Sequence, residues 1–359
     1  MAHPPIKRGS HSRIAIIDFA PFLDGTMKQS VADIMLSSFK DVGFVYLVNH
    51  GLPKYKVQAM FDLSKQFFDL PMETKNLAPH PPSGSHHRGY SAPGIEKVAQ
   101  HLYDKDEIAA HRAKAPDVKE SFEVGREGDP IQPNIWLPDD VLPGFKQACL
   151  DFFWVSILNH LKFKRHDLRL TLPRLVPLSQ ICDEIKFKIL SALALGLQLP
   201  EDFFNQFHQA PDNQLRLLHY PSVSASSLAT DTVTRIGAHS DFGSITLLFQ
   251  DNIGGLEVED PNDPGQFQAA PPVKDALIVN AGDLLMRWSN DIIRSTVHRV
   301  RAPPGLVAPN GMTPERYSIP YDFDKVVECL PGTYDEHRPQ RYEPISAMEY
   351  IMKRLESNY

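Results

Sequence analysis

The sequence has few cysteines, no long apolar run and no excess of basic residues. Its three cysteines, Cys149, Cys182 and Cys329, are too few and too widely spaced for a disulfide framework or a four-thiolate zinc site, which favours an intracellular, cytoplasmic protein. Segment 1–13 is polar and no run of about eighteen apolar residues occurs, so neither secretion nor a membrane span is predicted. With 37 basic and 44 acidic residues the chain lacks the positive field that nucleic-acid binding needs, and it carries no signal for an oligomeric state.

Proline, by contrast, is abundant. The chain has 31 prolines in 359 residues, which favours many turns and short strands over a helical bundle. Its apolar fraction of 42% is enough for a sizeable core, and the length admits one large domain or two ordinary ones.

The pattern of apolar residues predicts an α+β protein. In residues 1–150 it indicates a mixed α/β layer with strand, helix, strand and helix at 14–19, 31–39, 44–48 and 57–68. A loop rich in Pro, Ser, Gly and His follows at 79–93, and a buried helix is predicted over 182–197. Short strands typical of a β-sandwich or jelly roll then follow at 215–220, 244–249, 255–258, 276–279, 295–300 and 317–320.

Within this β-rich half, His239 and Asp241 are two residues apart, so on a strand their side chains leave by the same face. A second histidine, His298, lies on a later strand-like segment. Two imidazoles and one carboxylate form the facial set of non-haem Fe(II) oxygenases, which leaves coordination positions open. Taken alone, His298 is better explained as an ordinary core histidine, because isolated histidines seldom bind metals, and one His-x-Asp is weak evidence.

A second pair follows downstream. Arg316 and Ser318 are again two apart on a strand-like run, so a guanidinium and a hydroxyl share one face. Such a pair is suited to bind a carboxylate, with the guanidinium offering two parallel hydrogen bonds. The pair means little by itself, but its position after His-x-Asp and His makes the ordered set informative.

This ordered set resembles that of the 2-oxoglutarate/Fe(II)-dependent dioxygenases of the isopenicillin-N-synthase-like group, and the resemblance extends over nearly the whole chain. Four segments resemble more narrowly the fungal branch that includes thymine 7-hydroxylase: 88–94, 119–123, 243–251 and 295–300. The resemblance implies a double-stranded β-helix, or jelly roll, with flanking helices. It places a single catalytic domain over 1–359, with the jelly-roll core in 210–325.

The resemblance also implies the cofactors, Fe(II) with 2-oxoglutarate and O₂ as co-substrates, and the residues that hold them. Iron is assigned to His239, Asp241 and His298, and 2-oxoglutarate to Arg316, Ser318 and Tyr220. The implied reaction oxidises a C–H bond of a small organic molecule, a heterocycle or a secondary-metabolite intermediate, with release of succinate and CO₂. The alternatives are an iron oxidase that does not use 2-oxoglutarate and a catalytically impaired binding protein.

Substrate contacts are implied for five residues. Arg216 and Phe242 match positions that contact the base in thymine-hydroxylase-like members, although Phe242 replaces the usual tyrosine and the pocket therefore loses a hydroxyl. The chain departs from the family pattern at 317–324, so the covering aromatic is either Phe323 or misplaced. Arg88 and Tyr90 are candidates to close over the substrate because they lie on the long loop, and a loop position without such a role is the alternative.

Two further segments invite interpretation. Residues 156–181 are basic and interrupt the resemblance, so we interpret them as a non-family insert, either a contact for a partner or anionic lipid or an intron translated through an error of gene modelling. Lys119 and Glu120 are predicted to form a solvated charged edge, with the entrance of the site as the alternative.

Overall fold

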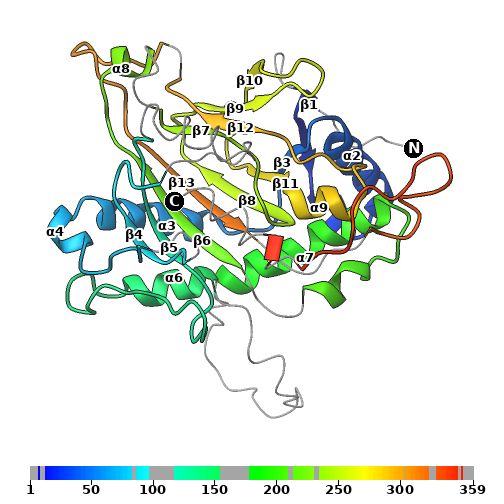
Figure 1. Ribbon diagram of the computed structural model, residues 1–359, viewed down its shortest axis with the longest axis horizontal. Coiled ribbons are helices and arrows are strands. Elements are labelled where there is room, and N and C mark those ends of the chain that lie inside the picture. The colour runs from blue at the N-terminus through cyan, green and yellow to red at the C-terminus, as the bar shows by residue number, and fades with distance from the viewer. Residues whose placement is uncertain are drawn as a thin grey trace.

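The computed structural model describes residues 7–8, 13–82, 86–96, 117–153, 178–208, 213–229, 234–303, 305–322, 329–346 and 349–350. In this part of the chain, two β-sheets face each other and helices cover the outer side of the larger sheet (Figure 1). This is the predicted jelly roll with flanking helices.

The strands fall into a major and a minor sheet. The major sheet has the order β1 (Lys7–Arg8), β2 (Ala15–Asp18), β3 (Phe44–Val48), β11 (Leu277–Ala281), β8 (Ile245–Gln250), β13 (Arg316–Asp322), β6 (Gln214–Tyr220), β5 (Glu120–Val124) and β4 (Gly89–Ser91). The minor sheet has the order β10 (Phe267–Ala269), β9 (Leu256–Glu259), β12 (His298–Val300) and β7 (Ile236–His239). Neighbours are antiparallel except for the parallel pair β2 and β3.

The helices include long ones that pack on the major sheet and short ones that connect strands. Figure 1 shows α3, α6 and α7 along one side of the major sheet, with the strands of the minor sheet on the other. The helical elements are α1 (Ala20–Leu23), α2 (Lys28–Asp41), α3 (Lys54–Phe68), α4 (Met72–Lys75), α6 (Phe145–Phe153), α7 (Leu178–Gly196), the 3₁₀ helix η2 (Phe203–Phe207), α8 (Ala225–Ala229) and α9 (Asp283–Trp288).

Strand β6 shows how alternation separates two cores. Leu215 and Leu217 belong to the large cluster between the major sheet and the helices. Leu218 and Tyr220 belong instead to a second cluster between the two sheets, because successive positions in this strand serve opposite faces. The space between the sheets is therefore lined by side chains of both, and it is here that the site forms.

The structure refines several expected elements. The strand predicted at 295–300 begins only at His298, and the helix predicted from Cys182 already begins at Leu178. The strands of the amino-terminal layer join both ends of the major sheet. Most of 156–181 lies outside the described residues, so its interpretation as an insert stays a prediction. None of the helices described is long and apolar enough to cross a membrane.

Candidate active site

The two predicted histidines and the aspartate meet between the sheets. His298, the first residue of β12, pairs in register with His239, the last residue of β7, and their rings lie 4.2 Å apart. Asp241 follows two residues after His239. Its Oδ1 lies 3.9 Å from Nε2 of His239 and 3.7 Å from Nε2 of His298. One ligand atom from each residue is thus within 4.8 Å of the other two.

Each imidazole turns Nε2 toward Asp241 and is oriented by a hydrogen bond at its other nitrogen, Nδ1. Nδ1 of His239 lies 2.9 Å from the carbonyl oxygen of Gly237, and Nδ1 of His298 lies 3.2 Å from that of Thr296. Because a carbonyl oxygen only accepts hydrogen bonds, Nδ1 carries the proton in both rings and Nε2 keeps its lone pair. A second partner of this kind is the usual way in which a metal-binding histidine is oriented.

The carboxylate of Asp241 is held in the same manner. Its Oδ2 accepts hydrogen bonds from Thr246 Oγ1 at 2.5 Å and Asn280 Nδ2 at 2.7 Å, so Oδ1 is turned toward the imidazoles. Burial and then the nearby His298 lower the pKa of His239. Burial alone would raise the pKa of Asp241, but His298 and His239 bring it below its ordinary value. Neutral imidazoles and an ionised carboxylate are the forms that bind Fe(II), so the residues fit this ion.

A second group of possible ligands, His80, His87 and Glu123, also lies within 4.8 Å, but its carboxylate is already engaged. Glu123 Oε1 is 2.8 Å from Arg216 Nη2, and Oε2 accepts from Gln214 and contacts His87 Nδ1. An added cation beside this paired guanidinium would be repelled. The chemistry of the donors therefore favours the set around Asp241.

Arg316 and Ser318 point into the same space from β13, and both are about 1% exposed. Arg316 Nη1 donates to Ser318 Oγ at 3.1 Å, and Nη2 donates to Gln250 Oε1 at 3.1 Å. The guanidinium lies over the ring of Tyr220, 4.9 Å from its centroid. One cavity is lined by the three possible ligands together with Arg316, Ser318, Tyr220 and Arg216.

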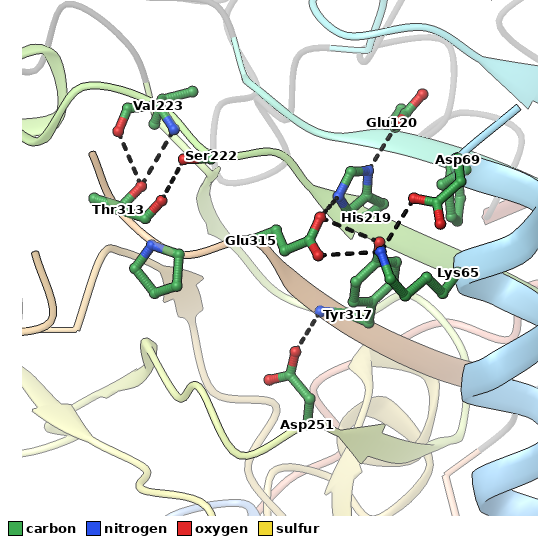
Figure 2. A network of polar contacts seen from close by, with 12 residues as sticks. Lys65, Asp69, Glu120, His219, Ser222, Val223, Asp251, Thr313, Glu315 and Tyr317 are labelled. Atoms are coloured by element: carbon green, nitrogen blue, oxygen red, sulfur yellow. Dashed lines mark hydrogen bonds and ion pairs between the residues drawn. The ribbon is translucent and has the colours of Figure 1, made fainter. Parts of the chain in front are cut away.

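The outer face of β13 explains why Arg316 points inward. Figure 2 shows Glu315 and Tyr317, the neighbours of Arg316, on the side of α3. Glu315 pairs with Lys65 at 3.2 Å and with His219 at 3.3 Å. Tyr317 stacks on His219 with ring centroids 4.6 Å apart. Because these alternate side chains are fixed outside, the pleat directs Arg316 and Ser318 inside.

The predicted substrate residues have different positions. Arg216 lines the cavity, and its Nη2 lies 2.7 Å from Glu96 Oε2 as well as 2.8 Å from Glu123 Oε1. Phe242 is buried directly after Asp241 but does not line this cavity, as far as the described residues define it. Phe323 lies outside the described residues.

Of the two residues predicted on the long loop, Arg88 precedes strand β4 and Tyr90 lies within it, and both are buried in contacts of their own. Arg88 donates to the carbonyl oxygens of His87 and Gln132, and the hydroxyl of Tyr90 donates to Glu120 at 2.5 Å. Neither lines the cavity formed by the described part of the chain.

The prediction of a solvated edge at Lys119 and Glu120 is wrong. These residues are 3% and 5% exposed. Lys119 pairs with Glu96, while Glu120 pairs with Lys75 and His219, each at 2.7 Å. Partners so distant in the chain leave no local pattern in the sequence, which is why charge alone suggested a surface.

Sequence reasoning also missed Thr246, Asn280, Gln250 and Arg235. Thr246 follows Asp241 along the same motif, and Asn280 interrupts the apolar run of β11, so a polar residue within a buried strand was the available signal. Gln250 and Arg235 had no comparable signal.

A jelly roll that brings two histidines and one aspartate together beside a buried arginine defines a non-haem iron oxygenase. Comparison with known proteins makes the class specific. The chain matches the 2OG-Fe(II) oxygenase superfamily over residues 211–325 and the family described as non-haem dioxygenase in morphine synthesis N-terminal over 14–139. It belongs to the 2-oxoglutarate/Fe(II)-dependent oxygenase family, and it is a dioxygenase that uses iron and 2-oxoglutarate.

Several of its relatives are fungal enzymes. Proline hydroxylase buaE of Petromyces alliaceus is 36% identical over 96% of this chain and 98% of its own. The 2-oxoglutarate-dependent dioxygenase frbA of Dothideomycetidae sp. (strain 11243) is 35% identical over 96% and 97%. The crystal structure of Neurospora crassa thymine 7-hydroxylase with alpha-KG and thymine has a TM-score of 0.79 and 39% identity, covering 97% of this chain and 98% of that one. The predicted resemblance to the fungal branch is confirmed.

Proposed function

We propose that His239 and His298 bind Fe(II) through Nε2 and that Asp241 binds it through Oδ1. The observation that carries this proposal is the orientation of all three groups. Both Nδ1 atoms donate to the carbonyl oxygen of the residue two positions earlier in the chain, and Oδ2 is held by Thr246 and Asn280. The three remaining ligand atoms therefore face one point, and the three ligands leave positions for other molecules.

Arg316 and Ser318 are proposed to bind the distal carboxylate of 2-oxoglutarate, with a hydroxyl contact from Tyr220. The guanidinium is buried and oriented by Ser318 and Gln250, so it meets a carboxylate with little reorganisation. Bound Fe(II) and 2-oxoglutarate supply the oxidation of a substrate C–H bond by O₂, with release of succinate and CO₂. The chain contributes by orienting the reactants and excluding water from a buried site.

The proposed substrate is a small organic molecule, a heterocycle or a secondary-metabolite intermediate, with Arg216 at the substrate end of the cavity. Two relatives support this class. One is named a proline hydroxylase, and the Neurospora crassa thymine 7-hydroxylase has been crystallised with thymine, so both names point to small nitrogen heterocycles. Phe242, where the resemblance leads us to expect a tyrosine, brings no hydroxyl and does not line the cavity of the described residues, which argues against thymine itself.

An anaerobic reconstitution with Fe(II), 2-oxoglutarate and a panel of such heterocycles, followed by exposure to air, tests the proposal through succinate release. His239→Ala is expected to abolish succinate formation, and Arg316→Ala is expected to weaken it strongly. Arg299→Ala is a matched control, because Arg299 pairs at 2.7 Å with Glu257 in the minor sheet and does not line the cavity of the described residues. Succinate formation unchanged in Arg316→Ala would refute the assigned co-substrate site.

A further inference from the structure

The described residues hold two clusters of charged side chains near the cavity, and the two clusters differ in net charge. On the substrate side, Arg216 and Lys119 face Glu96 and Glu123, so positive and negative charges are equal in number. At the other end, Arg235 and Arg316 share one nearby carboxylate, Asp251. That end carries one positive charge in excess among the described residues, even with Asp251 ionised.

Arg235 immediately precedes β7 and is 0% exposed. Its Nη2 donates to Thr313 Oγ1 at 3.3 Å and to the carbonyl oxygen of Pro314, just before Arg316 in the chain. Its Nε and Nη1 are buried and have no hydrogen-bond partner within the described ranges, and the same holds for Nε of Arg316. Arg235 therefore links the minor sheet to the start of β13, and two of its nitrogens can still donate hydrogen bonds.

This arrangement is unfavourable without an anion. Burial and then the charge of Arg316 lower the pKa of Arg235 to about 10. Asp251 forms no ion pair with either guanidinium among the described residues, and its two oxygens accept the backbone N–H groups of Tyr317 and Ile253 instead. Burial raises the pKa of Asp251 even beside the two arginines. Two guanidiniums in a buried space are stabilised when a further carboxylate enters it.

We propose that Arg235, which lies behind the cavity lining among the described residues, is a second cation beside the subsite for the distal carboxylate, and that with Arg316 it makes the site selective for dianionic over monoanionic 2-oxo acids. Arg316 and Ser318 supply the direct contact, while Arg235 acts as a positioning residue through its charge and through its hold on the chain before Arg316. This proposal rests on the co-substrate site proposed above.

The test compares two co-substrates that differ only at the far end. Dissociation constants of 2-oxoglutarate and of 2-oxopentanoate, which has the same chain length but no distal carboxylate, are measured anaerobically on the Fe(II)-loaded full chain. Arg235→Met is expected to weaken the binding of 2-oxoglutarate by about 10- to 100-fold, the range for removing one positive charge a few ångströms from a carboxylate in a buried site, and to leave the binding of 2-oxopentanoate unchanged. Arg235→Lys, which keeps the charge, is expected to restore most of the selectivity.

Three further variants complete the test. Arg235→Gln keeps a donor for Pro314 and removes the charge, so it replaces the methionine variant if that one fails to fold. Arg299→Met, the matched control, is expected to bind both acids like the wild type. If Arg316→Met weakens 2-oxoglutarate and the uncharged Arg235 variants do not, or if these weaken both acids equally, the role of Arg235 is refuted and the proposed function stands. If Arg316→Met has no effect, the co-substrate site itself is wrong.

Discussion

Replacing Thr246 with valine should weaken iron binding while preserving the fold. Thr246 is 2% exposed on β8, and its hydroxyl is one of two donors to Asp241 Oδ2. Valine keeps the shape and the β-branching that suit a strand. The change removes a hydrogen bond to a charged group, worth about 1.5–3 kcal/mol. At 1.4 kcal/mol for each tenfold, the Fe(II) affinity should fall about 10- to 100-fold.

The assay is anaerobic competition for Fe(II) between the protein and a coloured chelator. Thr333→Val is the matched control, because Thr333 is also buried and its hydroxyl donates to the carbonyl oxygen of Leu330 at 2.6 Å, away from the cavity. The control should lose stability and keep its iron affinity. If Thr246→Val binds iron as tightly as Thr333→Val, the reasoning that Oδ2 orients Asp241 as a ligand is refuted.

Three other predictions concern stability and the chain itself. Burial alone would raise the pKa of Glu123, but Arg216 and His87 bring this pKa well below its ordinary value of 4.5. The ionised carboxylate therefore stabilises the fold fully above pH 4.5, and this stabilisation is lost as the pH falls. The unfolding free energy of Glu123→Gln should accordingly vary less with pH in the acid range than that of the wild type. Phe67 is fully buried among other aromatic rings, and Phe67→Ala should cost about 3–5 kcal/mol in denaturant unfolding without altering the iron affinity per folded chain. Sequencing of the transcript should yield reads that lack 156–181, and abundant reads that retain it would contradict the intron hypothesis.

The parts of the fold and site that could be predicted are those that depend on the spacing of residues within one short segment. His239 and Asp241, like Arg316 and Ser318, are two apart on or beside strands, so the period of the pleat places each pair on one face. The order of these pairs along the chain, together with His298, indicated the class of oxygenase. Their meeting point was not visible in any one segment, because it depends on the register between β7 and β12.

The parts that could not be predicted depend on partners far apart in the chain. Glu96 and Glu123 pair with Arg216 on β6, and no pattern in the sequence around either glutamate predicts these ion pairs. Charged residues are usually exposed, so Lys119 was placed on a surface, whereas its ion pair with Glu96 allows it to be buried. Arg235 escaped notice for the same reason. Such buried charges are evident only when the sheets have been assembled.

The central claim is that the chain holds iron between two histidines and one aspartate, with 2-oxoglutarate beside it. An anaerobic crystal structure with Fe(II) and 2-oxoglutarate tests this claim most directly. The account predicts an anomalous iron peak among Nε2 of His239, Oδ1 of Asp241 and Nε2 of His298, with the distal carboxylate at Arg316. A peak at His80, His87 and Glu123 in place of this position, or a co-substrate carboxylate away from Arg316, would contradict it.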